Sequence, residues 1–315
     1  MSRRLIDDPD AVSVLAARTA DATGIPAAHV EKDFWVTEVL RGVAAAAAEW
    51  DVEVWFKGGT SLSKVFGMID RFSEDVDMLV VLPPGSVGAQ DRVLRGLVEG
   101  AHLATGIDAV VDGPSTTKGV KRSARFHYNQ LDVGDHGLTN GILLELGTRG
   151  GAIGAAWAEV RSLIAEHIEE ISGEPEAAPV RVRVFAPWRT LAEKLVLLHT
   201  AHTSPEPAAA VRGARHFYDI YCLLSRPEVR SGVAEAGIGA LARDVCMYSR
   251  AAGLPAAERP GDGFASSPAF TEGPHIAAVA DEYANRVVGQ LLWPGRPHPS
   301  LRDCIDLVQR YADIL

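Results

Sequence analysis

Two short runs in the first third of the chain contain residue types suited to phosphate and to a metal ion. The first, KGGTSLSK at residues 57–64, follows an alternating apolar segment. Glycines between a strand and a helix permit a tight turn and let a ligand approach the backbone closely. The free N–H groups at the start of a helix favour phosphate. We therefore predict a phosphate-binding turn made of Gly58, Gly59, Thr60, Ser61 and Lys64.

The second run, RFSEDVD at residues 71–77, ends in two carboxylates spaced two residues apart. On a strand, Asp75 and Asp77 point to one face and their apolar neighbours to the other. Like charges at that spacing favour a hard cation with oxygen ligands, so we expect Mg²⁺ or Mn²⁺ here. Glu145, on a later predicted strand, is the candidate third ligand; the alternative is an ordinary solvated strand residue.

The apolar periodicity predicts the elements that must hold these runs. Strands are expected over 52–56, 76–81, 108–111, 125–132, 142–146 and 180–185. Helices are expected over 9–50, 62–69, 91–101, 155–170, 190–202, 211–224 and 301–315. We therefore predict an α+β fold in two lobes: an α/β lobe over residues 1–185 and a helical lobe over residues 186–315. The Gly/Pro-rich stretch 253–274 is too long for an inert connector and is predicted to be a lid or a partner-facing loop.

Composition excludes several classes of protein. With 31 Lys and Arg against 41 Asp and Glu, the formal net charge is −10, which argues against non-specific coating of nucleic acid. The 3 cysteines form no C-x-x-C motif, so a zinc ribbon is excluded. No Walker A loop or G-x-S-x-G motif is present. Without an apolar run of about 18 residues or a signal-peptide pattern, we expect a cytoplasmic protein and no membrane.

Five stretches, in the same order along the chain, resemble the AbiEii/AbiGii nucleotidyltransferase toxin family, including its MenT-like branch. This family lies within the DNA polymerase β-like nucleotidyltransferase superfamily. The matching stretches are 31–35, 56–64, 71–77, 191–195 and 217–221. From Arg226 onward no motif matches. The resemblance implies a mixed sheet with helices in the first lobe, and a helical second lobe that completes the active-site cleft.

The resemblance also implies residue roles. Asp75 and Asp77 become the metal-binding aspartates, and the two glycines become the turn that binds the nucleotide phosphates. Lys194 and Asp219 take the places of the family's essential lysine and aspartate. Ser73 matches a nucleotide-site serine that, in a MenT-like relative, the antitoxin phosphorylates to silence the toxin.

The implied activity is Mg²⁺-dependent transfer of a nucleotide from an NTP to the 3′ end of tRNA, which blocks aminoacylation and translation. The chain would then be the toxin of a type IV-like toxin–antitoxin system. Its cognate antitoxin would be a winged-helix AbiEi-like protein or a kinase-like one. Two alternatives stay open: nucleotidylation of a protein or GTP binding at the same metal site, and a non-catalytic partner-binding module.

Charged residues in the predicted helical lobe have a second interpretation. At 100° per residue, Asp219 shares a helix face with Arg212 and Arg215, opposite the main apolar seam. Asp219 is therefore either a base for, or an organiser of, the acceptor site, or a weak surface partner of Arg215. Lys194 lies at the edge of an apolar seam, as a snorkelling surface lysine also would.

One local basic cluster stands out against the acidic background. It consists of Lys118, Lys121, Arg122 and Arg125, and aromatic residues follow it. The cluster is either a solvated hairpin or a strip that contacts RNA while bases stack on the aromatics. Together with Arg212 and Arg215, it is the predicted RNA-binding surface.

Overall fold

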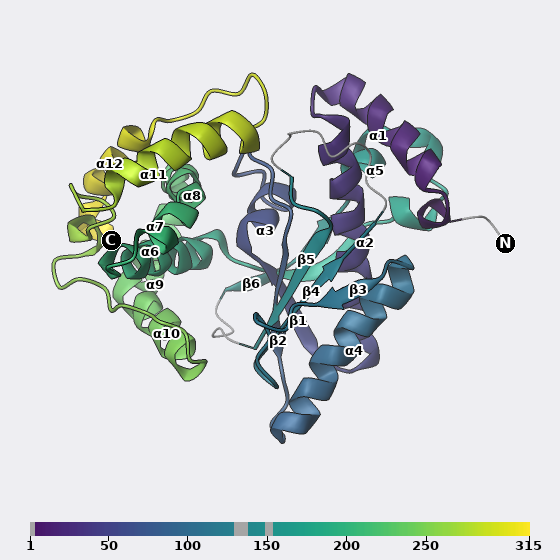
Figure 1. Cartoon of the computed structure of the whole chain (residues 1–315), viewed down its shortest axis with the longest axis horizontal. Helices are drawn as coiled ribbons and strands as arrows, with labels where there is room; N and C mark the ends of the chain where they lie inside the picture. Colours follow the sequence, from purple (N-terminus) through teal and green to yellow (C-terminus); the bar gives the residue numbers. More distant parts are fainter. Residues whose placement is uncertain (1–3, 129–137, 149–153) are drawn as a thin grey trace. The chain divides into compact units, whose positions relative to one another are not determined.

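The computed structural model describes residues 4–128, 138–148 and 154–315, and it divides into two compact units. The first comprises residues up to Gly67, Phe72–Thr148 and Ala155–Val184. The second comprises Phe185–Leu315 together with the short segment Met68–Arg71, which lies between the two runs that open the site. Figure 1 shows the elements of each unit, coloured along the chain.

A seven-stranded sheet forms the centre of the first unit, in the order β3-β4-β5-β2-β1-β7-β6. Its strands are β1 (Glu53–Lys57), β2 (Val76–Val81), β3 (Ala109–Val111), β4 (Lys121–Phe126), β5 (Ile142–Gly147), β6 (Ala155–Val160) and β7 (Val180–Phe185). β2 is antiparallel to β1 and parallel to β5, and β1 is parallel to β7. The predicted α+β fold with a mixed sheet is confirmed.

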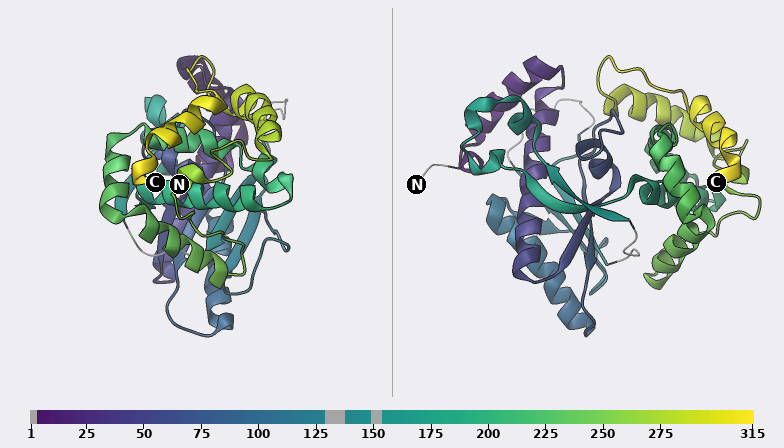
Figure 2. Two further views of the ribbon diagram at one scale, coloured as in Figure 1. Left: turned by 90° about the vertical axis from the view of Figure 1, so that its left-hand side faces the viewer. Right: turned by 180° about the vertical axis from the view of Figure 1, so that it is seen from behind.

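Two long helices cover one face of this sheet. Because side chains alternate along a strand, Phe56, Met78 and Leu144 point into the core and are fully buried. α2 (Ala27–Glu49) and α4 (Val87–Thr105) lie side by side over this face in Figure 1 and Figure 2. The opposite face, called the polar face here, carries polar side chains such as Asp77 and Glu145 next to the buried apolar side chains of Trp55 and Leu79.

The remaining helices of the first unit are short, apart from the first. They are α1 (Pro9–Thr23), α3 (Gly58–Lys64) and α5 (Leu163–His167). The predicted helix over 62–69 is wrong beyond Lys64, because Gly67 takes a left-handed conformation with φ 55° and ends the helical path.

The predicted helix over 155–170 is wrong in its first half. Residues Ala155–Val160 form the edge strand β6. There Trp157 lies against the guanidinium groups of Arg181 and Arg183, 4.7 and 5.2 Å from the ring centroid. Pairing with the neighbouring β7 outweighs the local helix preference. The strand predicted over 125–132 begins earlier, at Lys121, and residues 129–132 lie outside the described part.

The second unit is helical in its described residues. Its helices are α6 (Pro187–Thr203), α7 (Pro207–Arg212), α8 (Arg215–Leu224), α9 (Pro227–Ala236), α10 (Ile238–Ala251), α11 (Ile276–Glu282), a π-helix (Tyr283–Leu291) and α12 (Leu301–Arg310). The prediction of a single helix over 211–224 is wrong, because the helical path is interrupted at Gly213, between α7 and α8. Among the described residues, no helix combines the length and apolar character needed to cross a membrane.

Residues 253–274 were predicted to form a lid or a partner-facing loop, and the structure differs from this prediction. Phe264 and Phe270 are 0% and 1% exposed. Phe270 packs against Phe217 of α8, with ring centroids 5.6 Å apart. Much of the stretch is therefore part of the core of the second unit.

The close packing of α2 and α4 predicts opposite effects for two glycines on the same helix. A Cβ at Gly100 would lie 2.3 Å from the Cβ of Ala46, whereas the nearest atom to a Cβ at Gly88 is 3.9 Å away. We expect Gly100→Ala to destabilise the protein by about 1–3 kcal/mol through overpacking. Gly88→Ala should be neutral or slightly stabilising, as helix propensity predicts. Urea unfolding of both variants tests this, and equal effects would contradict the packing.

Candidate functional site

Two carboxylates lie opposite each other on the polar face of the sheet. Asp77 on β2 and Glu145 on β5 are register partners, and Asp77 is also the partner of Lys57 on β1. On the far side of Glu145, its partner on β4 is Ser123. One row across four strands therefore reads Lys57, Asp77, Glu145, Ser123. The neighbouring apolar residues of β2 point to the covered face, as predicted.

The Glu145 carboxylate is held by a cation and two polar groups. Lys121 Nζ lies 2.6 Å from its Oε1, and the Ser123 hydroxyl donates to the same oxygen over 3.3 Å. Asp77 is also within hydrogen-bonding reach. Burial raises the pKa of Glu145, but Lys121, Asp77 and Ser123 together outweigh it and leave the pKa below its usual range. Lys121 therefore supplies positive charge beside the pair.

The turn at Gly58 lies against the other carboxylate of the pair, that of Asp77. Gly58 opens α3 in a left-handed conformation, with φ 79°. A Cβ at this position would lie 2.2 Å from Asp77 Oδ2. Only glycine lets the turn approach the carboxylate this closely.

Hydroxyl groups connect the turn to the second run. Thr60 Oγ1 donates to the backbone oxygen of Asp75 over 2.5 Å. Because a hydroxyl has one proton, Thr60 accepts from Ser73, whose Oγ lies 2.9 Å away. Ser61 is fully buried and donates to the carbonyl of Gly58 over 2.9 Å. These bonds fix the turn against the residues that precede β2.

The donor set fits a hard cation in its chemistry, although it is not a complete centre. Oxygen ligands are what Mg²⁺ and Mn²⁺ prefer. Asp77 and Glu145 supply adjacent carboxylates, and Asp75 immediately precedes β2. Within the described residues, no group of three Asp, Glu, His or Cys side chains is close enough to hold a metal ion. The three-carboxylate site remains a prediction.

Buried ion pairs from α2, absent from the predicted site residues, hold both runs in place. Lys32 is fully buried and pairs with Glu74, the residue before Asp75. It also donates to the carbonyl of Thr139 over 2.5 Å. The sequence contains a signal for these ion pairs, because three consecutive charged residues (31–33) lie within an otherwise apolar helix.

The neighbouring residue of α2 makes a second anchor. Asp33 accepts from Lys64 over 2.5 Å and from the backbone N–H of Leu163 over 2.7 Å. The ammonium of Lys64, expected to bind phosphate, therefore has a carboxylate partner in this structure.

The second unit contains its own buried charge cluster. Asp219 on α8 is fully buried. The guanidinium of Arg71 donates to both its oxygens, over 2.6 and 2.8 Å. Lys194 on α6 donates to Oδ2 over 2.7 Å. A weak surface pair with Arg215 is thereby excluded for Asp219, and Lys194 is no snorkelling surface residue.

The cluster carries more positive than negative charge. Burial raises the pKa of Asp219, but Arg71 and Lys194 outweigh it, so the carboxyl stays ionised with a pKa well below its usual range. Burial lowers the pKa of Lys194, as do the charges of Arg71 and Arg215, while Asp219 opposes them. His216 accepts from Lys194 over 3.2 Å, and burial and Lys194 lower its pKa to about 3. His216 is therefore neutral.

The structure separates the predicted RNA-binding residues. Lys121 and Arg125 share the polar face of β4, whereas Arg122 points to the opposite face and pairs with Asp91 over 3.2 Å. Lys118 is exposed before β4, Arg212 is exposed on α7, and Arg215 is partly buried on α8. No single strip contains all of them.

Comparison with known proteins decides the family. A sequence profile of the nucleotidyl transferase AbiEii toxin, from type IV toxin–antitoxin systems, matches residues 39–289. The chain belongs to the AbiEii toxin family. The match extends well beyond Arg226, into the part of the chain where no motif was recognised in the sequence. Within the AbiEii family, nucleotidyl transfer is the shared activity, and an antitoxin is the implied partner.

The chain also matches solved structures. MenT4, a nucleotidyltransferase toxin from Mycobacterium tuberculosis H37Rv, is 17% identical, with 96% of each chain covered and a TM-score of 0.49. No curated protein sequence gives a significant match. The family assignment therefore rests on the sequence profile alone.

The contact between the turn and Asp77 predicts a difference between two glycines with the same backbone preference. Gly58→Ala should abolish nucleotidyl transfer, because its Cβ displaces the Asp77 carboxylate. Gly67 has φ 55°, but a Cβ there meets nothing within 4 Å. Gly67→Ala should therefore cost only the backbone strain, about 1 kcal/mol, and retain activity. Transfer of a labelled nucleotide by each variant is the measurement; equal activities would contradict the assignment.

The buried cluster predicts a large effect from one carboxylate. Asp219→Asn leaves Arg71 and Lys194 buried without a counter-charge and should destabilise the protein by about 3–5 kcal/mol. Asp306, which pairs with Arg302 over 3.1 Å on the surface of α12, is the matched control. Asp306→Asn should change stability by less than about 1 kcal/mol.

The direction of the Asp219 pKa shift determines how this difference in stability depends on pH. The folded pKa of Asp219 is depressed, so its contribution is complete above the unfolded pKa of about 4 and is lost in stronger acid. Unfolding followed at several pH values should show a constant gap between wild type and Asp219→Asn above that point. A gap that closes near neutrality would contradict a buried, ionised Asp219.

Proposed function

We propose that this AbiEii-family chain is a Mg²⁺-dependent nucleotidyltransferase that transfers a nucleotide from an NTP to the 3′ end of tRNA. Pyrophosphate is released, and the modified tRNA is no longer aminoacylated. The observation that carries the proposal is the Asp77–Glu145 pair, which lies against the Gly58 turn on the polar face of the sheet.

In this proposal, Asp75, Asp77 and Glu145 hold Mg²⁺ or Mn²⁺. The metal, when bound, supplies charge neutralisation on the triphosphate and polarises the attacking hydroxyl. Gly58 and Gly59 bring backbone close to the phosphates, because no side chain stands in the way. Thr60 and Ser73 keep the turn and Asp75 together through their hydroxyl bonds.

Asp219 acts by positioning and not as a base. Its oxygens accept from Arg71 and Lys194, and its pKa lies well below its usual range, so it is a poor proton acceptor near neutrality. Asp219 orients the ammonium of Lys194, to which we assign contact with a phosphate of the NTP. Arg71 precedes Ser73 and Asp75 closely in the chain, so Asp219 also fixes the start of the metal-binding run.

The acceptor RNA is assigned to the polar face of β4. Lys121 and Arg125 lie on the same face as Glu145, whereas Arg122 does not. Arg125 donates to the carbonyl of Asn140 over 3.0 Å and remains partly exposed. In an acidic chain, these local cations and Lys118 supply phosphate contacts. Arg212 and Arg215, in the second unit, are a separate candidate patch for RNA.

Regulation is assigned to Ser73 and to an antitoxin, either winged-helix or kinase-like. Ser73 donates its proton to Thr60 beside Asp75. A phosphate on Ser73 would remove that donor and place about two negative charges next to the carboxylates. Both effects oppose nucleotide binding.

The test is expression of the full chain with labelled NTPs added to total RNA and total protein from the host. Asp75→Ala should lose toxicity and labelling, because the metal site loses a ligand. Asp21→Asn, which removes an exposed carboxylate from α1, should behave as wild type. Undiminished toxicity of Asp75→Ala would overturn the proposed activity.

The same experiment separates the acceptors. Label at tRNA 3′ ends supports the proposal. Label confined to the protein fraction would replace the tRNA acceptor by a protein, with the metal site unchanged. Absence of label in both fractions, with no melting shift on adding Mg-NTP, would indicate a non-catalytic partner-binding module.

A further inference from the structure

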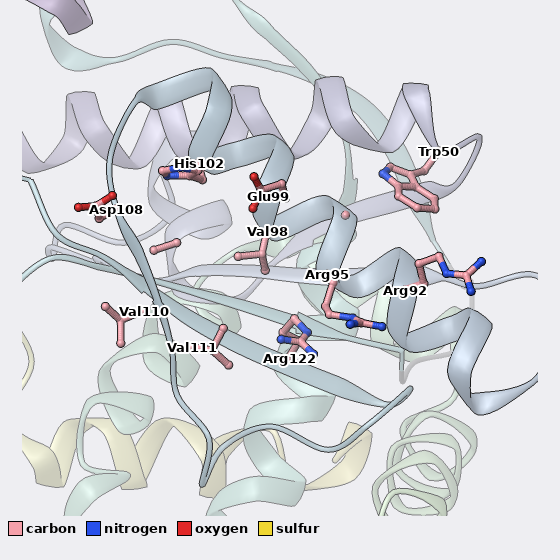
Figure 3. A pocket seen from close by; sticks show the side chains of 12 residues that line it. Trp50, Arg92, Arg95, Val98, Glu99, His102, Asp108, Val110, Val111 and Arg122 are labelled. Atoms are coloured by element: carbon pink, nitrogen blue, oxygen red, sulfur yellow. The ribbon is translucent and has the colours of Figure 1, made fainter.

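A groove of about 900 Å³ runs along the edge of the sheet in the first unit. It lies between α4 and β3, and Figure 3 shows the side chains that line it. None of the residues proposed for the metal, the nucleotide or catalysis lines it. The groove therefore needs an explanation of its own.

The wall formed by β3 is a free strand edge. β3 is the first strand in the sheet order and pairs only with β4 within the described sheet. The carbonyl of Asp108 and the N–H of Asp112 both bond to residues next to or within β4. Backbone groups alternate in direction along an antiparallel strand. The N–H and C=O groups of Ala109 and Val111 therefore point outward, and both residues line the groove.

Exposed apolar side chains line both sides of the groove, among the charged residues of α4. Trp50 is 39% exposed and lies against Gly96 of α4, where a Cβ would come within 2.3 Å of the indole. Val110 and Val111 are 57% and 43% exposed on the strand side. Such partly exposed apolar groups beside unpaired backbone are what an added strand covers.

The two ends of the groove carry opposite charge. Arg92 and Arg95 lie on the part of α4 near one end, and Arg122 lies beside Val111 in Figure 3; Asp91 pairs with both Arg95 and Arg122, over 3.2 Å in each case. Asp108 lies at the other end in Figure 3, and Glu99 lies between the two ends. A chain with a net charge of −10 thus has a local excess of guanidinium groups at one end of a free strand edge.

We propose that this groove binds an extended segment of a partner protein, which adds to β3 as a further strand. The segment alternates apolar and polar residues, and an acidic side chain meets the Arg92 and Arg95 end. Its backbone pairs with the outward N–H and C=O groups of Val111 and Ala109. The proposal is independent of the nucleotidyl transfer activity.

Charge decides against RNA as the occupant. A polynucleotide that followed the groove would place phosphates beside Glu99 and Asp108, which repel them. It would also leave the outward backbone groups of β3 without partners. An extended peptide satisfies both walls.

The experiment selects a displayed library of random eight-residue peptides against the full-length protein. Val111→Pro removes the outward N–H while leaving the β4 ladder intact, since proline is accepted at strand edges. Val111→Thr keeps the N–H and is the matched control. Arg92→Glu reverses the charge at one end without altering the backbone.

We expect selected peptides to contain an acidic residue among alternating apolar ones. Their affinity should fall by about tenfold or more for Val111→Pro and for Arg92→Glu, and stay unchanged for Val111→Thr. Nucleotidyl transfer should be the same in all three variants. If Val111→Pro does not fold, peptide binding by Arg92→Glu tests the proposal instead, and a loss of binding is the expected result.

Three results would overturn the proposal. One is that no selected peptide distinguishes Val111→Pro from Val111→Thr. Another is that octauridylate RNA binds and is released by Arg92→Glu, which would make the groove an RNA site. The third is concentration-dependent self-association that Val111→Pro abolishes, because the free edge would then pair with a second copy of the chain.

Discussion

The candidate site in the first unit depends on a contact between two carboxylates on neighbouring parallel strands. Asp77 and Glu145 lie in register on β2 and β5, in the middle of the sheet. Like charges so close require compensation. Lys121 provides part of it from β4, and Gly58 brings a turn without a side chain to the other carboxylate. The polar face of the sheet is built around this pair, and α2 and α4 on the opposite face hold its strands.

Buried ion pairs hold the segments next to the candidate site residues in place. Lys32 binds Glu74, next to Asp75, so α2 fixes the start of β2. In the second unit, Asp219 holds Arg71 and Lys194 in a cluster shielded from water. The RFSEDVD run is divided between the units: Arg71 belongs to the second, and Phe72–Asp77 belong to the first. A seven-residue motif thus contains both an anchor and a candidate metal site.

Local patterns in the sequence were sufficient for several of the strands and for the face of β2 on which Asp77 lies. Alternation placed β1, β2 and β7, and the D-x-D spacing placed Asp77 on the polar face. Local patterns failed where distant partners decide. Ala155–Val160 is a strand because β7 needs a neighbour, and the Arg71–Asp219 pair joins residues 148 positions apart. In the basic cluster, alternation sends Arg122 of β4 to the face opposite Lys121 and Arg125, which argues against the alternative of a single strip. Ion pairs such as Lys32–Glu74 have no short-range signature beyond charge within an apolar helix.

The central claim is that the Asp77–Glu145 pair is a metal site. The most direct measurement is titration of the full chain with Mn²⁺, followed by electron paramagnetic resonance, for wild type, Asp77→Asn and Glu145→Gln. The account predicts bound Mn²⁺ in wild type that Mg²⁺ displaces, with affinity weaker by about tenfold or more in each variant. Equal Mn²⁺ binding by all three proteins, or none by wild type with or without NTP, would contradict it.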